Sequence, residues 1–208
     1  MGMSFIYAAT EDELSEVLAD RLIATTDDLF TNTTHMGRKG CTYLKRKLPE
    51  LLKLAGNIPV LLLVDLDRGS CAPALISSWM RGQHQPNNLL LRVIVREAEA
   101  WLLADQQGFS DYFGVPLNKL PQDPETMVDP KEKLLSLVWN YTKQPIKGDV
   151  VVKSSSGLRQ ALSYNARMRD FVHNGWSLQR ACASADSLSR ACNRMQQLSN
   201  KIRNEVHI

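Results

Sequence analysis

The most hydrophobic part of the chain is a continuous run, VLLLV, at residues 60–64. Two similar runs occur in MSFIYAAT, residues 3–10, and in LLLRVIV, residues 89–95. Runs of this kind are typical of strands buried on both faces, as in a parallel sheet covered by helices. Asp65 and Asp67 directly follow the central run, so either a cation compensates these carboxylates or the strand simply ends there.

Between these runs, apolar residues recur every three or four positions, which is the period of an amphipathic helix. A capping box from Thr10 to Glu13 is expected to start the first helix, and a short second strand is expected at residues 29–31. Helices are predicted for residues 11–24, 42–57, 70–82 and 97–105. This alternation predicts an α/β fold with a mostly parallel central sheet flanked by helices.

The pattern changes after Asp105. Residues 106–129 are rich in proline and show no clear period, which indicates an irregular connector. A helix is predicted to begin at Pro130, and the sequence from residue 153 looks helical to the end, with Ser187 as the N-cap of the last helix. The buried stripe of that helix is predicted to consist of Leu188, Cys192, Met195, Leu198 and Ile202.

Two regions are therefore predicted. Residues 1–105 form the α/β core, and residues 106–208 form a connector and a helical C-terminal region packed on that core. The apolar stripes of these helices pack either against each other or against a second subunit. The sequence therefore leaves both a monomer and a homo-oligomer open.

Composition limits the class of protein. Hydrophobic residues make up 44% of the chain and charged residues 23%, and no stretch approaches the length of a membrane span. The N-terminal residues lack the features of a secretion signal, so we expect a cytoplasmic protein with no membrane partner. The four cysteines show no metal-binding spacing and are expected to be reduced and mostly buried.

Charge is distributed unevenly along the chain. Residues 147–208 hold 10 lysines and arginines against 4 acidic residues, a net charge of +6, whereas the whole chain carries +3. A basic region of this kind suits a polyanion such as nucleic acid, although a solvated helical face would have the same composition.

Acidic residues follow three of the predicted strands. They are Glu11 after the first strand, Asp65 and Asp67 after the central one, and Glu97 with Glu99 after the last. Ligands of open parallel sheets bind at the carboxyl ends of the strands. In an extended chain Asp65 and Asp67 would face the same side about 7 Å apart and could share one cation. Carboxylate oxygens without thiolate or imidazole favour Mg²⁺ or Mn²⁺.

Each acid also has a purely structural interpretation. Glu11 would favour the helix macrodipole, and Glu97 and Glu99 open a helix, where acidic residues are common. Asp67 with Gly69 fits a turn. Beyond these acids, the chain contains no P-loop, dinucleotide-binding, serine-hydrolase or HExxH motif.

These residues resemble a known family. A strand-end acid before an amphipathic helix, followed by a hydrophobic strand ending in Asp-x-Asp, resembles the Toprim domain. That domain is the Mg²⁺-binding fold of topoisomerases, primases and the nucleases associated with overcoming-lysogenization-defect ATPases. VLLLVDLDR, followed by VREAEAWLLAD and a helical end, is more closely similar to the Toprim-like DUF4276 family, whose members are often found beside ATPase genes in bacterial defence or mobile loci. The motifs cover residues 4–105.

The resemblance implies a Toprim-like three-layer fold with a C-terminal helical extension. It also implies a Mg²⁺-dependent nuclease or phosphotransfer effector that acts on DNA or RNA. Asp65 and Asp67 would bind the metal, Glu11 would complete its shell or act as general base, and Glu97 would be a second-site or structural acid.

Two basic residues stand next to these acids. Arg68 and Arg96 are candidates for phosphate binding, and simple ion pairs with the same acids are the alternative.

The chain departs from the family pattern at one point. The family pattern is E-G-x-T-E, and aligning Thr10 and Glu11 with its last pair places Tyr7 at the first acid and Ala8 at the glycine. This departure motivates a second hypothesis, a non-catalytic Toprim-like partner or regulator of an ATPase. A third is a glycosyltransferase whose Asp-x-Asp holds Mn²⁺ and a sugar-nucleotide diphosphate.

Overall fold

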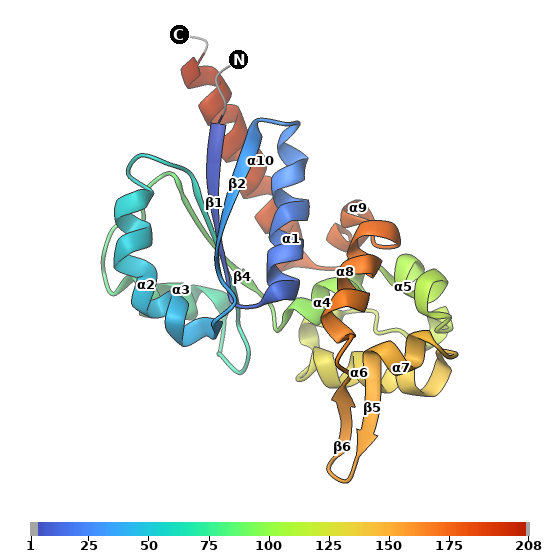
Figure 1. The fold of residues 1–208 in the computed structure, drawn as a ribbon. Coiled ribbons are helices and arrows are strands. Elements are labelled where there is room, and N and C mark those ends of the chain that lie inside the picture. The colour runs from blue at the N-terminus through green and yellow to red at the C-terminus, as the bar shows by residue number, and fades with distance from the viewer. Residues whose placement is uncertain (1–3, 207–208) are drawn as a thin grey trace. The chain divides into compact units, whose positions relative to one another are not determined.

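The computed structural model describes residues 4–206 and divides into two compact units (Figure 1). The first consists of the residues up to Ile94 together with those from Ser189 onward. The second is Val95–Leu188. Within the described residues, no helix is both long enough and apolar enough to cross a membrane.

The first unit is built on a four-stranded sheet in which every strand pairing is parallel. Its strands are β1 (Ser4–Thr10), β2 (Phe30–Gly37), β3 (Val60–Asp65) and β4 (Leu89–Ile94), in the order β2-β1-β3-β4. The predicted α/β fold with a parallel sheet flanked by helices is thereby confirmed. The second strand is longer than the predicted residues 29–31. Its polar sequence, TNTTHMG, lacks the apolar pattern from which the other strands were predicted.

Strand β3 is apolar because it is an inner strand covered on both faces. Residues 60–64 are at most 1% exposed, and the strand pairs with β1 on one side and β4 on the other. The chain runs from β1 to β2 in one direction along the sheet and from β3 to β4 in the other. The order of strands therefore switches between β1 and β3, where open α/β sheets bind ligands.

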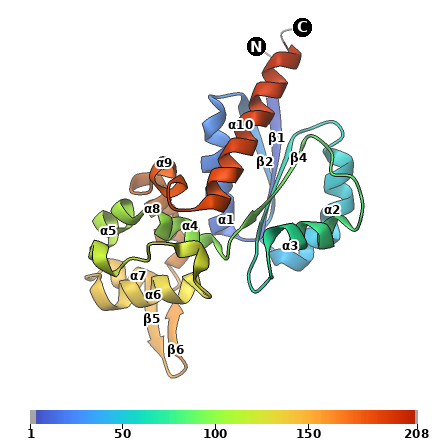
Figure 2. The same ribbon diagram turned by 180° about the vertical axis from the view of Figure 1, so that it is seen from behind.

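Four helices cover this sheet. They are α1 (Glu13–Ile23), α2 (Gly40–Leu54), α3 (Ala72–Met80) and the part of α10 (Asp186–Val206) that starts at Ser189. Helices α2 and α3 lie on one side of the sheet, and α1 and α10 lie on the other (Figures 1 and 2). A short 3-10 turn, η1 (Ala24–Thr26), follows α1, and Arg203 of α10 donates a hydrogen bond to the carbonyl oxygen of Thr26 at 2.7 Å.

The second unit is mainly helical. Its elements are α4 (Ala98–Ala104), α5 (Gln106–Phe113), η2 (Leu117–Lys119), η3 (Pro124–Thr126), α6 (Pro130–Tyr141), α7 (Ile146–Val150), β5 (Val151–Ser154), β6 (Gly157–Gln160), α8 (Tyr164–Asn174) and α9 (Leu178–Cys182). An aromatic cluster forms part of its core, in which the ring of Phe109 lies 4.5 Å from Phe113 and 5.7 Å from Phe171, centroid to centroid.

Two segments of this unit differ from the sequence-based prediction. Residues 151–160, expected to be helical from residue 153, form an antiparallel hairpin of β5 and β6. The turn-forming Ser-Ser-Gly sequence explains it, since Gly157 has a φ of +117° that other residues rarely adopt. The supposedly irregular connector contains α5, which Asp105 caps by accepting a hydrogen bond from the Gly108 N–H at 3.0 Å.

Two local predictions are wrong. Helix α1 is capped by Asp12, whose Oδ1 accepts from the Ser15 N–H at 2.8 Å, so Thr10 and Glu13 form no capping box. Helix α10 begins at Asp186, one residue before the predicted N-cap Ser187. The Ser187 hydroxyl instead accepts from the indole N–H of Trp101 at 2.8 Å, because a buried indole needs an acceptor.

The cysteines also differ from expectation. Within residues 4–206 no disulfide joins them, but none is fully buried, and Cys71 is exposed. In the stripe of α10, Leu188, Met195 and Leu198 are buried as predicted, whereas Cys192 is only partly covered.

Candidate functional site

The strand-order switch brings Glu11 and Asp65 together. Glu11 is the first residue after β1, and Asp65 is the last residue of the adjacent strand β3. One carboxylate oxygen of Glu11, Oε1, accepts a hydrogen bond from the backbone N–H of Asp65 at 3.0 Å. This bond spans 54 positions of sequence and holds the Glu11 carboxylate at the carboxyl edge of the sheet.

The end of β2 completes this edge through a close backbone contact. At Gly37 a side chain is impossible without rearrangement, because an added Cβ would lie 1.9 Å from the carbonyl oxygen of Thr10. The Gly40 N–H then donates to the carbonyl oxygen of Glu11 at 3.0 Å. These contacts place the first turn of α2, including Cys41, beside Glu11, and the Cys41 thiol is hydrogen-bonded to the Glu11 carboxylate.

Asp67 lies in a turn, not in the strand. Strand β3 ends at Asp65, and Asp67 has a left-handed φ of 49°. The intervening Leu66 is 4% exposed, and its carbonyl oxygen accepts from the Gly69 N–H at 2.8 Å. The extended-chain argument that placed Asp65 and Asp67 on one side is therefore wrong, although their assignment as metal ligands stays a prediction.

Negative charge accumulates around Glu11. Burial, together with the nearby charges of Asp67 and Asp12, raises the pKa of its carboxyl group to about 7, against the lowering effect of the Asp65 N–H. Burial, Glu11 and Asp67 also raise the pKa of the Cys41 thiol to about 11, so Cys41 is a protonated donor at neutral pH. A carboxylate whose pKa is raised in this way is a mark of many functional sites.

The raised pKa of Glu11 predicts a pH-dependent effect of Glu11→Gln. The folded protein holds this proton more tightly than the unfolded chain, where the ordinary pKa is 4.5, so the stabilising effect is complete below pH 4.5 and is lost as pH rises through about 7. The shift corresponds to at most about 3 kcal/mol, and partial exposure to solvent reduces this to about 1–2 kcal/mol.

Without divalent cations, Glu11→Gln should therefore gain about 1–2 kcal/mol over the wild type between pH 5 and pH 8. Urea denaturation at both pH values, in the presence of a chelator, measures this gain. Glu50→Gln on the exposed side of α2 is the control and should show no such change. A difference between Glu11→Gln and wild type that is the same at both pH values would contradict the assignment.

A second ionic cluster links β2 to α1 near this edge. The guanidinium of Arg38 makes a two-point contact with the Glu16 carboxylate, in which the Nε–Oε2 distance is 2.9 Å. This bond is the main reason why the pKa of Glu16 is lowered. Nε2 of His35 lies 3.3 Å from Oδ1 of Asp20. The cluster joins strand and helix, and the sequence analysis did not identify it.

The other predicted site residues are Arg68, Arg96 and Glu97, and each has a different environment. Arg68 is exposed in the turn after β3. Arg96 and Glu97 belong to the second unit, where Glu97 Oε2 accepts from the Lys131 N–H at 3.2 Å. Glu99 is buried, and its Oε1 lies 3.2 Å from Lys131 Nζ. Helix packing therefore accounts for the environment of Glu99, and the metal role of Glu97 stays a prediction.

The donor chemistry of the edge suits Mg²⁺, but the donors are few. Among residues 4–206, no group of three or more His, Cys, Asp or Glu side chains is placed to hold a metal ion. Mg²⁺ commonly uses only one or two carboxylates and takes its other ligands from water and substrate phosphates. Glu11 with Asp65 or Asp67 is compatible with that mode of binding.

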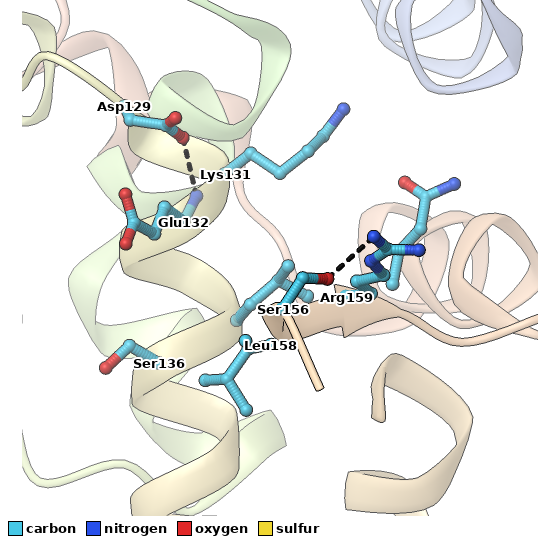
Figure 3. A pocket seen from close by; sticks show the side chains of 10 residues that line it. Asp129, Lys131, Glu132, Ser136, Ser156, Leu158 and Arg159 are labelled. Carbon is cyan, nitrogen blue, oxygen red and sulfur yellow. Dashed lines mark hydrogen bonds between the residues drawn. The ribbon is translucent and has the colours of Figure 1, made fainter. Parts of the chain in front are cut away.

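A separate cavity of about 660 Å³ lies within the second unit (Figure 3). It is bounded by the first turns of α6 and by the β5–β6 hairpin. Arg159 Nη2 donates to the Ser156 hydroxyl at 2.7 Å, and the Glu132 N–H donates to Asp129 Oδ1 at 2.7 Å. None of the six predicted site residues lines this cavity.

A comparison of the chain with protein-family profiles, with curated proteins and with solved structures finds no match. The function is therefore inferred from the chemistry of the residues themselves.

Proposed function

We propose that the first unit is a Mg²⁺-dependent, Toprim-like nuclease or phosphotransfer domain that acts on nucleic acid. The observation that carries this proposal is the position of Glu11, whose carboxyl group has a pKa of about 7 beside Asp65 and Asp67 at the strand-order switch. Carboxylates that repel one another in a partly buried site are stabilised by a divalent cation. The resemblance to Toprim-like proteins agrees with this chemistry.

Asp67, Asp65 and Glu11 are the residues that would hold the cation. When bound, Mg²⁺ would polarise a phosphoryl oxygen and lower the pKa of a coordinated water. Glu11 itself has a pKa close to neutral pH, which suits a group that accepts a proton from an attacking water or hydroxyl. Cys41 keeps its proton and orients the Glu11 carboxylate through their hydrogen bond.

A basic surface at the start of α2 supports nucleic acid as the substrate. Lys39 Nζ lies 5.2 Å and the Arg46 guanidinium carbon 5.6 Å from the centroid of the Tyr43 ring. Basic side chains bind the phosphate backbone, and aromatic rings stack on bases. Tyr43 is two residues from Cys41, so this surface begins beside the acidic edge.

Binding of Mn²⁺ tests the metal site. Titration calorimetry should detect about one ion per wild-type chain and none in Asp65→Ala/Asp67→Ala, because the variant keeps only Glu11 of the three proposed ligands. Circular dichroism establishes that both proteins are folded. Equal binding by the two folded proteins would exclude these aspartates as ligands.

A non-catalytic partner of an ATPase is the second candidate, suggested by Tyr7 in place of an acid. Tyr7 pairs with Val60, the first residue of β3, and lies three residues before the end of β1. A carboxylate at position 7 would therefore lie inside the sheet, away from the edge that bears Glu11. Absence of Mn²⁺ binding together with a stable complex with an ATPase would favour this candidate.

A further inference from the structure

Three arginines gather on the face of the sheet that α10 covers. Arg92 lies on β4, and Arg190 and Arg194 lie one helical turn apart on α10. Figure 2 shows α10 lying along this face of the sheet. Burial lowers the pKa of Arg92, and the positive charges of Arg194 and Arg190 lower it further, so the three cations are close enough to repel one another.

Arg92 is an unusual residue for its position. It occurs in a strand of otherwise apolar residues, between Leu91 at 2% exposure and Val93 at 4%. Its Nε atom is buried and has no hydrogen-bond partner in the structure. Within residues 4–206 no carboxylate forms an ion pair with it. A buried guanidinium nitrogen without an acceptor is costly, and most such groups in native proteins have a partner or a bound ion.

Arg190 and Arg194 on α10 make the position of Arg92 still less favourable, because their charges repel it. Arg194 is exposed, and its Nη1 donates to Gln197 Oε1 at 2.7 Å. Arg190 is also exposed. An oxyanion between the three side chains would supply the missing acceptor and cancel the repulsion in one step. Tetrahedral oxyanions such as phosphate match the forked geometry of guanidinium groups.

We propose that Arg92, Arg190 and Arg194 form a binding site for a phosphate group. This site does not depend on the proposed metal-dependent activity. Its position nevertheless suits a polynucleotide backbone, because Arg92 pairs with Leu63 of β3, two residues before Asp65. Side chains of a strand alternate between faces, so Arg92 shares a face of the sheet with Asp65.

Thermal unfolding at low ionic strength, with phosphate or with chloride at matched ionic strength, tests the site. Phosphate should raise the Tm of the wild type by about 3–5 °C more than chloride does, because a ligand of the native state alone stabilises it. Arg92→Met and Arg190→Ala/Arg194→Ala should lose this rise. Lys53→Ala on α2 removes one exposed positive charge elsewhere in the same unit and should keep it.

Arg92→Met serves a second purpose. Methionine fills much of the same space without a charge, so the variant should fold and be at least as stable as the wild type when phosphate is absent. Equal stabilisation of wild type and Arg92→Met by phosphate would overturn the proposal. So would equal effects of phosphate and chloride on the wild type.

A second experiment distinguishes between a free phosphate and the phosphate groups of a polynucleotide backbone as the ligand of this site. Fluorescence anisotropy of a labelled single-stranded oligonucleotide, measured with a chelator, should show about tenfold weaker binding to Arg92→Met than to wild type if the site takes a polynucleotide backbone. Phosphate-specific stabilisation without this difference assigns the site to a free phosphate. Loss of metal binding in Asp65→Ala/Asp67→Ala with intact phosphate binding would separate the two sites.

Discussion

Asp65→Ala/Asp67→Ala should lower Mg²⁺-dependent cleavage of single- or double-stranded nucleic acid by at least about 100-fold, since a bound metal contributes several kcal/mol of charge stabilisation. The substitutions lie at the end of β3 and beyond it, where Asp67 is exposed, so the parallel sheet should persist. Cleavage of labelled DNA and RNA over time, with Mg²⁺ or with a chelator, measures the effect.

Asp123→Ala is the matched control for this variant. Asp123 is an exposed aspartate of the second unit, and its replacement removes one of the same carboxylate groups without touching the edge of the sheet. It should cleave like the wild type. Cleavage that persists in the folded double variant, or that survives chelation in the wild type, would reject the assignment of these aspartates.

Asp105→Ala should destabilise the protein by about 3–5 kcal/mol, because it removes a buried charge that has several partners. Asp105 is 0% exposed. Its carboxylate accepts hydrogen bonds from the backbone N–H groups of Gly108 at 3.0 Å and Ser177 at 2.6 Å. It also accepts from Arg180 Nε at 2.6 Å and from Arg180 Nη2 at 2.8 Å. Alanine would leave two backbone donors without an acceptor beside a cavity.

Urea unfolding followed by circular dichroism measures this loss. Asp111→Ala is the control, because Asp111 is exposed on α5 and accepts only from the Gln107 side chain among the bonds described, so its loss should stay within about 0.5 kcal/mol. Asp105→Asn keeps the shape of the side chain and one acceptor oxygen, so its loss of stability should lie between those of Asp105→Ala and Asp111→Ala. If Asp105→Ala destabilised the protein no more than Asp111→Ala does, the four hydrogen bonds of Asp105 would contribute little to stability.

The parallel sheet could be predicted because its inner strands carry their own signal. Residues 60–64 are apolar without interruption, and only a strand covered on both faces requires this. The acidic residues after the strands could also be predicted to meet, since the carboxyl ends of parallel strands share one edge. The hydrogen bond from the Asp65 N–H to Glu11 agrees with that reasoning.

Other features depend on contacts that no local pattern records. The sequence offered a turn at Asp67 with Gly69 as one alternative but gave no reason to prefer it to an extended chain, and Cys41 reaches Glu11 only because β2 extends to Gly37. The cluster around Arg92 combines residues about 100 positions apart in the sequence. The β5–β6 hairpin had a signal, the Ser-Gly pair, which the helical composition around it outweighed.

The division of the chain has a consequence for the order in which the protein is made. The second unit is continuous in sequence, from Val95 to Leu188, whereas the first needs both the residues up to Ile94 and those from Ser189 onward. During synthesis the sheet therefore leaves the ribosome long before α10, and the part of the sheet that α10 covers stays exposed while the whole second unit is translated. Emergence of α10, and not emergence of the N-terminal strands, is therefore the event that completes the sheet-bearing unit.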